Sequence, residues 1–213
     1  MLNLLRGTGL AVLLMVAGQA SADPIRDMVL AAQMDNPTTV RKLLGKGLSP
    51  NTVDPVTGEP VVIVALREGS NGVLDLLLAH AELAVEQAAP NGNTALMMAA
   101  FKHNKRAAQT LLARGANVNR AGWSPLHYAA SSGAVEIAVM LLERGARIDA
   151  PSPGGFTPLM LAAREGHLDA AVLLVHQGAN ARLQNVENLT AAQIARRADR
   201  ADIAAAIKNA GGQ

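Results

Sequence analysis

The sequence predicts an all-α repeat solenoid, in which helix-turn-helix units are stacked and joined by β-hairpin-like loops. The segment Ser124–Ala130 recurs as Thr157–Ala163, and an alanine holds the same place in six successive copies at spacings of 34, 34, 30, 33 and 33 residues. A fixed period of this length is typical of one small unit stacked many times, because a single unit cannot bury its apolar faces alone. The repeated alanines are Ala31, Ala65, Ala99, Ala129, Ala162 and Ala195.

Each unit is expected to begin with a capped helix. In four copies a Ser or Thr stands at the start, where its side chain can accept a hydrogen bond from an amide of the next turn. Pro125 and Pro158 follow two of these caps, at a place where the missing N–H costs nothing. Paired alanines further on favour a helix and let a neighbouring helix approach closely. The four expected caps are Thr94, Ser124, Thr157 and Thr190.

A second helix and a turn-rich link complete the unit. Apolar runs with helical spacing follow the first helix, over residues 40–44, 73–78, 107–112, 135–142 and 170–174. A glycine after the run supplies the left-handed residue that ends a helix. Links such as Pro90–Asn93 and Pro153–Gly155 predict hairpin tips. The glycine column is Gly47, Gly115, Gly145, Gly178 and Gly211, with Ala81 in the second copy.

One link is expected to differ from the others. The link that ends at Ser124 is three residues shorter than the link that ends at Thr157. The helices on either side can keep their register, because the shortening falls between units. We therefore expect a truncated hairpin there and a notch in the row of tips.

The period and the Ser/Thr-Pro-Leu-x-x-Ala-Ala phrase resemble the ankyrin repeat, a family with a period of about 33 residues. The resemblance covers roughly residues 24 to 213; it is strong in copies three to five and weaker in the first, second and sixth. Terminal copies are expected to depart from the pattern because one face has no neighbour. The resemblance implies a domain over residues 23–213 of six repeats, with limits near 23–54, 55–88, 89–121, 122–151, 152–184 and 185–213.

Residues 1–22 have the pattern of a signal peptide. Arg6 provides the positive start, the apolar stretch 10–17 follows, and Ala20–Ala22 is an A-x-A site that places cleavage before Asp23. The stretch is short for a membrane span, so an uncleaved anchor is the alternative to cleavage, and no stable membrane insertion is expected after it. The chain has no cysteine, which excludes disulfides and thiolate zinc sites. We expect export to a bacterial periplasm, with secretion as the alternative.

Composition and charge narrow the class of protein. Half of the residues are hydrophobic and four are aromatic, which suits thin helices packed through small side chains. The formal net charge of +2 is too small to indicate a general nucleic-acid-binding surface. The charge is uneven, at −4 over residues 23–100 and +5 over residues 101–213. This is typical of solvated helix faces; the alternative is a bipolar surface that steers a partner.

No catalytic constellation is found in the sequence. Ser124 and His127 are close enough to suggest nucleophilic catalysis, but the ankyrin resemblance implies a structural pair in which the ring bonds the hydroxyl and backbone near Ser124. His103 and His167 stand at junctions between paired helices, and no pair of histidines has metal-ligand spacing. We expect no enzyme activity, no cofactor and no metal. The histidines are His80, His103, His127, His167 and His176.

The resemblance also implies where a partner binds. Ankyrin arrays bind proteins along a concave face, through the residue before the Thr/Ser and the two residues after the Ala-Ala step. Aromatic residues at three of these places predict the centre of the face, since aromatic and Arg side chains dominate interface energetics. Packing of hairpin against hairpin is the alternative for Trp123 and Phe156, and Tyr128 is expected to face the core. The predicted contact residues are Arg67, Glu68, Phe101, Lys102, Trp123, Ser131, Ser132, Phe156, Arg164 and Glu165.

The sequence therefore predicts a non-catalytic, exported, monomeric module that binds or stabilises another protein, such as a periplasmic enzyme. Two alternatives remain at this point. One is an exported effector or enzyme accessory that acts directly on a target. The other is an enzyme whose chemistry sits on the repeat scaffold.

Overall fold

A computed structural model describes residues 23–210, so the predicted signal peptide and the last glycine of the column lie outside the described residues. This part of the chain contains twelve helices in six successive pairs and no strand, which confirms an all-α repeat solenoid. The first helices of the pairs are α1 (Pro24–Gln33), α3 (Val61–Glu68), α5 (Ala95–Phe101), α7 (Pro125–Ser132), α9 (Pro158–Glu165) and α11 (Ala191–Arg197). The second helices are α2 (Pro37–Gly45), α4 (Asn71–Ala79), α6 (Lys105–Ala113), α8 (Val135–Glu143), α10 (Leu168–His176) and α12 (Ala201–Ala210).

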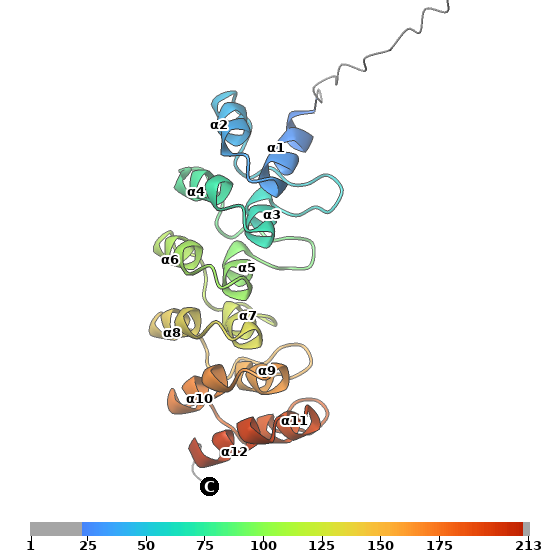
Figure 1. Cartoon of the computed structure of the whole chain (residues 1–213), viewed down its shortest axis with the longest axis vertical. Coiled ribbons are helices and arrows are strands. Elements are labelled where there is room, and N and C mark those ends of the chain that lie inside the picture. Colours follow the sequence, from blue (N-terminus) through green and yellow to red (C-terminus); the bar gives the residue numbers. More distant parts are fainter. Residues whose placement is uncertain (1–22, 211–213) are drawn as a thin grey trace, which may run out of the picture.

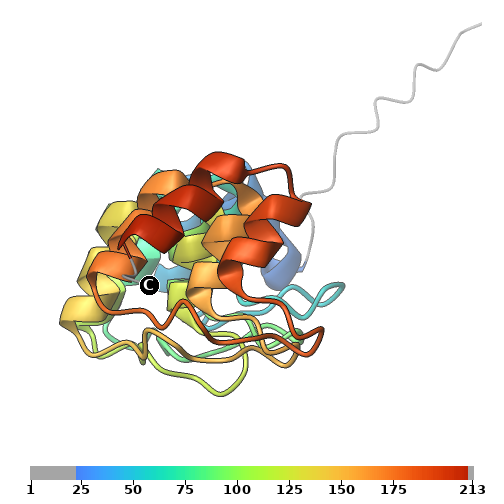
Figure 2. The same ribbon diagram turned by 90° about the horizontal axis from the view of Figure 1, so that it is seen from below.

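The helices form two columns, and the links between pairs project to one side (Figures 1 and 2). Each first helix packs against the first helix of the next pair, and each second helix does the same in its own column. Contacts are therefore made between neighbours along the stack, as in other solenoids. The first helices and the links together make one continuous face, which we call the first-helix face.

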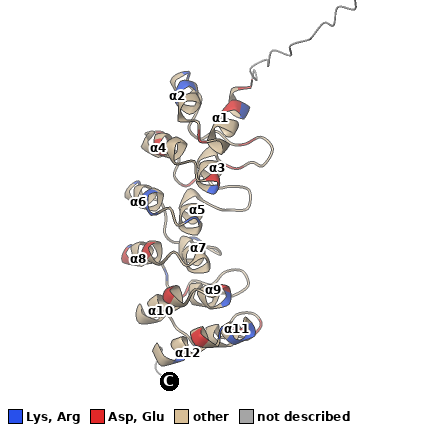
Figure 3. Cartoon of the chain, viewed as in Figure 1, with Lys and Arg blue, Asp and Glu red and all other residues tan. Residues whose placement is uncertain are grey.

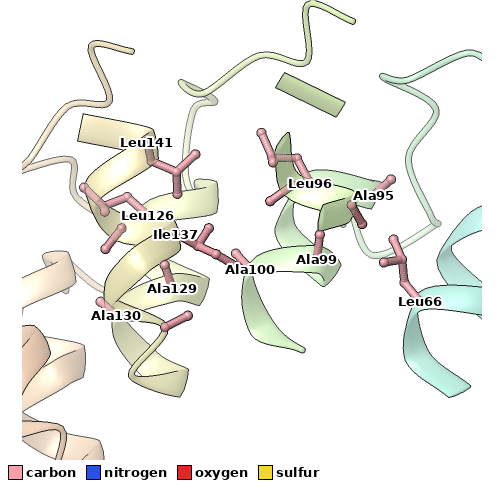
Figure 4. Packing of buried hydrophobic residues seen from close by; sticks show 14 of the residues in the cluster. Leu66, Ala95, Leu96, Ala99, Ala100, Leu126, Ala129, Ala130, Ile137 and Leu141 are labelled. Carbon is pink, nitrogen blue, oxygen red and sulfur yellow. The ribbon is translucent and has the colours of Figure 1, made fainter. Parts of the chain in front are cut away.

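The core is built from small side chains between successive first helices. Ala100 of α5 lies toward Ala129 of α7, and Ala99 lies on the side of α5 toward Leu66 of α3 (Figure 4). All three alanines are without solvent exposure, and Leu126 of α7 and Leu141 of α8 are fully buried beside them. Alanine has no side chain beyond Cβ, so the helix axes can lie close together. The paired alanines thus have the packing role predicted from their repetition.

The helix starts follow the predicted caps, with one exception. The hydroxyls of Thr94, Thr157 and Thr190 each accept a hydrogen bond from the amide three residues later, at 3.4 Å. In the second repeat Pro60 occupies the cap of α3 and makes no side-chain bond. Ser124 caps α7 in a different way, through His127, and this pair is described with the candidate site.

The helix ends use left-handed residues at two places in most units. Gly115 and Gly178, after α6 and α10, have φ of 84° and 94°, as the glycine column predicts. A second left-handed residue joins the paired helices, and there His103 has a φ of 55° where Gly133 and Gly166 stand in the next repeats. His103 replaces glycine at this junction, as expected, and its Nε2 lies 2.8 Å from the carbonyl of Ser132.

The second repeat ends its outer helix without a glycine. α4 stops at His80, which is extended (φ −73°, ψ 126°), so no left-handed residue closes this end. The guanidinium of Arg114, from the next repeat, donates to four carbonyls here, at distances of 2.7 to 3.1 Å. The four acceptors are the carbonyls of Leu78, His80, Ala81 and Leu83. Leu78 lies in the last turn of α4 and the other three residues follow it, so Arg114 supplies bonds at a helix end where a glycine motif supplies them elsewhere.

The links form hairpin-like tips, except the short one. Single antiparallel bridges join Val53 to Pro60 and Ala88 to Thr94, and Ser152 bonds the carbonyl of Phe156 at 2.9 Å. The link ahead of α7 has no such bridge among the described residues and projects less far than its neighbours in Figure 1. Its shape agrees with the truncated hairpin and the notch predicted from spacing.

Charged side chains are unevenly distributed over the stack (Figure 3). α7 carries none, while the C-terminal turns of α9 and α11 carry several. The described residues contain no helix that is both long and apolar enough to cross a membrane.

A candidate protein-binding face

A groove of about 440 Å³ lies on the first-helix face, where α5, α7 and α9 meet. We call it the Trp123 groove. Half of the predicted contact residues line it, and they come from three successive repeats. The structure thus brings these five together, although their spacing in sequence reaches 64 residues. The five are Phe101, Trp123, Ser131, Arg164 and Glu165; Tyr128, His127 and Leu161 complete the lining.

Tyr128 is the centre of an aromatic cluster in this groove. Its ring makes edge contacts with Phe101 and with Trp123, each with centroids 6.3 Å apart. Its hydroxyl donates to Oδ1 of Asn93 at 2.5 Å, which fixes the ring against the preceding repeat. Burial raises the pKa of Tyr128, so the phenol stays neutral. The expectation that Tyr128 only faces the core is incomplete, because the half-buried ring also forms part of the groove.

Phe101 and Trp123 keep large exposed areas. Phe101 is 47% exposed at the end of α5, and Trp123 is 41% exposed on the short link. Trp123 also contacts the ring of His127 edge-on, at 5.5 Å between centroids. The ring is therefore positioned by two neighbours and still presents surface to solvent. The structure shows ring packing for Trp123, and its contact with a partner stays a prediction.

Phe156 differs from Trp123, although both precede a helix cap. It is half-buried against the core, and the guanidinium of Arg164 lies 5.0 Å from its ring centroid. Nε of Arg164 also donates to Oε1 of Glu165 at 2.8 Å. Packing thus accounts for part of the Phe156 surface, and Arg164, which lies over its ring, also borders the Trp123 groove.

The remaining predicted contact residues lie outside the Trp123 groove. Arg67 forms ion pairs with Glu68 and with Glu59 at the end of α3. Lys102 borders a separate groove of about 330 Å³ beside His103. The hydroxyl of Ser132 donates to the carbonyls of Tyr128 and Ala100, at 2.9 and 3.2 Å. Their place in a contact surface stays a prediction.

The Ser124–His127 pair is enclosed in the stack. Nδ1 of His127 accepts from the backbone N–H of Ser124 at 3.1 Å and lies 2.8 Å from its hydroxyl oxygen. Nε2 reaches the carbonyl of Phe156 in the next repeat at 3.0 Å, so the ring is neutral with its proton on Nε2. His127 is 0% exposed, and burial lowers its pKa. The pair has the structural arrangement that the resemblance implied, with an added bond between repeats.

Comparison with protein families decides what the repeated unit is. The model for ankyrin repeats, which describes three copies, matches residues 28–121, 84–152 and 119–185. The chain belongs to the ankyrin-repeat family. Ankyrin repeats commonly mediate protein–protein interaction and are generally non-catalytic binding modules. The described ankyrin repeats contain no group of three His, Asp or Glu side chains placed to hold a metal ion.

A human protein is similar in sequence to part of this chain. The chain is 34% identical over 118 residues to transient receptor potential cation channel subfamily A member 1 of Homo sapiens. The match covers 54% of this chain and 10% of the human protein, so the chain spans about a tenth of that relative. The similarity concerns repeat sequence and carries no channel function to this chain.

Sequence reasoning missed the part of Tyr128 in the groove. The signal for it was present, because Tyr128 follows Trp123 by five residues and Asn93 stands at the place of Trp123 one repeat earlier. In a stack of ankyrin repeats, equivalent places in adjacent copies are neighbours in space. A search for aromatic residues across adjacent copies would have identified the cluster.

Proposed function

We propose that this chain is an exported ankyrin-repeat module that binds another protein through the first-helix face, centred on the Trp123 groove. The observation that carries the proposal is the cluster of Phe101, Trp123 and Tyr128, in which Phe101 is 47% and Trp123 41% exposed. Exposed aromatic side chains held in place by neighbours can contribute much to binding, since little conformational entropy is lost when they are covered. The module has no catalytic role of its own in this proposal.

The test is capture with matched baits. The chain from Asp23 onward, carrying a C-terminal tag, is used on a periplasmic extract beside a Phe101→Ala/Trp123→Ala double variant and a Leu168→Ala control. Leu168 is 38% exposed and begins α10, a second helix outside the first-helix face. A protein retained by the parent and control baits and lost by the double variant supports the proposal. Equal retention by all three places binding elsewhere and contradicts it.

The proposed location rests on the leader sequence alone. The apolar stretch 10–17 and the Ala20–Ala22 site support cleavage before Asp23 and release into the periplasm, with secretion as the alternative. Ala22→Arg should block cleavage, because a small residue is required there. Fractionation and N-terminal sequencing of both forms test this. An intact N-terminus on the parent chain would favour an uncleaved anchor.

Stabilisation of the partner is a second consequence to measure. If the captured protein is an enzyme, its half-life and activity are followed with and without this chain. A rise in either identifies the module as an accessory protein. An unchanged enzyme leaves binding as the function.

A further inference from the structure

We infer that the Trp123 groove receives a positively charged side chain, lysine or arginine, from the partner protein. The inference rests on the proposed function, because it names the chemistry that the face recognises. Three rings line one space, and the planes of Phe101 and Trp123 stand at 84° and 68° to that of Tyr128. Rings at steep angles around a space present π faces to a group placed between them, and such faces attract cations.

The polar atoms of the groove are mainly acceptors. The hydroxyl proton of Tyr128 is donated to Asn93, and that of Ser131 to the carbonyl of Tyr128 at 3.2 Å. Both oxygens therefore keep lone pairs and have no further proton to give. The ring nitrogens of His127 are both already bonded within the stack. A ligand group rich in N–H donors, as ammonium and guanidinium are, matches this set.

Charge at the rim favours the same ligand. Glu165 lines the groove, and one of its oxygens, Oε1, bonds Arg164, while no bond to Oε2 is found within the described residues. Arg164 is the single cation of the lining, and it is held over the ring of Phe156 on the neighbouring side. α7, which forms the floor, carries no charged residue (Figure 3). A cation entering the groove thus meets three rings and a carboxylate whose charge is shared with Arg164.

An uncharged aliphatic side chain is the competing occupant, and a matched pair of probes separates the two. Nα-acetyl-arginine amide and Nα-acetyl-citrulline amide are nearly equal in shape and differ in charge. Because Trp123 is the only tryptophan of the chain, its emission reports on this groove directly. Each probe is titrated into the chain from Asp23 onward at low ionic strength, with choline as a third probe for small quaternary ammonium compounds.

We expect a saturable change in Trp123 emission with the arginine probe, at concentrations on the order of millimolar, and about tenfold weaker binding of the citrulline probe. Phe101→Leu removes a ring and keeps an apolar side chain. This substitution and Glu165→Gln should each lower the affinity for the arginine probe several-fold. Glu187→Gln is the control, because Glu187 pairs with Arg197 outside the groove. Its binding should equal that of the parent.

Three results would overturn the inference: equal binding of both amides, no saturable response to arginine, or a response to choline alone. The first identifies an apolar pocket and the last a small-molecule site. These failures are distinct from failure of the proposed function. Loss of capture by the double variant together with equal binding of the two amides would leave the protein-binding face intact and remove only its preference for cations.

Discussion

At the scale of the residue, the ring of His127 bonds two successive repeats. One nitrogen closes the turn at Ser124, and the other reaches the carbonyl of Phe156. Met160 holds the same place in the next repeat. Its sulfur accepts a hydrogen bond from the N–H of Thr157 at 3.5 Å, which is a weaker form of the bond between His127 and Ser124. Within the described residues, Met160 makes no bond like that of His127 to Phe156. His127 therefore gives the interface between the fourth and fifth repeats a side-chain bond that Met160 does not give to the next interface.

His127→Ala should lower the free energy of unfolding by about 1–3 kcal/mol, because it leaves the buried N–H of Ser124 without this partner and removes one of the two hydrogen bonds to the carbonyl of Phe156. His127→Gln is the comparison, since Gln193 accepts from Thr190 in the same way in the last repeat. The glutamine variant should recover part of the loss. Urea denaturation followed by circular dichroism measures all three. An alanine variant with the same free energy of unfolding as the parent would show that these hydrogen bonds do not stabilise the folded chain.

The same ring makes stability depend on pH. Burial holds the pKa of His127 below its ordinary value of 6.5, so the unfolded chain binds a proton more readily than the folded one. This contribution to stability is complete above pH 6.5 and is lost as the pH falls through the unfolded value toward the folded one. The free energy of unfolding, compared at pH 8 and pH 5.5, should fall less in His127→Gln than in the parent. An equal fall in both would assign the dependence to other groups.

At the scale of the element, the end of α4 depends on a residue of the next repeat. Arg114 bonds four carbonyls at a place where α2, α6, α8 and α10 are followed by a left-handed glycine. The planar guanidinium can reach several acceptors at once, which an ammonium group cannot do. In the second repeat, hydrogen bonds from the third repeat therefore replace the glycine motif that ends the second helix in other repeats.

Arg114→Ala should destabilise the stack by about 2–3 kcal/mol, since charged hydrogen bonds are lost and carbonyls are left unsatisfied. Arg114→Lys keeps the charge and should recover less than half of this. Amide exchange at residues 77–83, read by mass spectrometry, should rise in the alanine variant before exchange elsewhere. Amide exchange that rises equally in all repeats would contradict a local role for Arg114.

At the scale of the whole molecule, stability is shared between neighbours along the stack. A chain of residues 23–184 lacks α11 and α12, and contacts from these helices reach α9 and α10. Nearest-neighbour coupling predicts a lower melting temperature with the first five repeats still folded. Trp123 emission and circular dichroism should therefore report a folded chain at 25 °C. Loss of the native Trp123 spectrum would mean that the stack is cooperative over its full length.

The architecture could be predicted from the sequence because each unit repeats the same residues at the start, middle and end of its helices. Ala99, Thr94 and Gly115 each recur at the same place in other copies, so their roles support one another. The role of Arg114 could not be predicted in this way. Arg144 holds the same place in the next repeat and donates to the carbonyl of Met140 in its own helix, whereas Arg114 acts on the preceding repeat. Tyr128 was missed for the same reason: its neighbours Asn93 and Phe101 belong to another unit. Contacts made within a unit are readable from its pattern, while those made across units need the stacking geometry.

The uneven charge takes on a physical meaning once the repeats are stacked. Because the stack is elongated along the order of its repeats (Figure 1), the −4 of residues 23–100 and the +5 of residues 101–213 lie toward opposite ends. Such a molecule has a permanent electric dipole along its long axis. Near an anionic surface it experiences a torque that turns the C-terminal repeats inward, over a range of roughly 8 Å at physiological ionic strength.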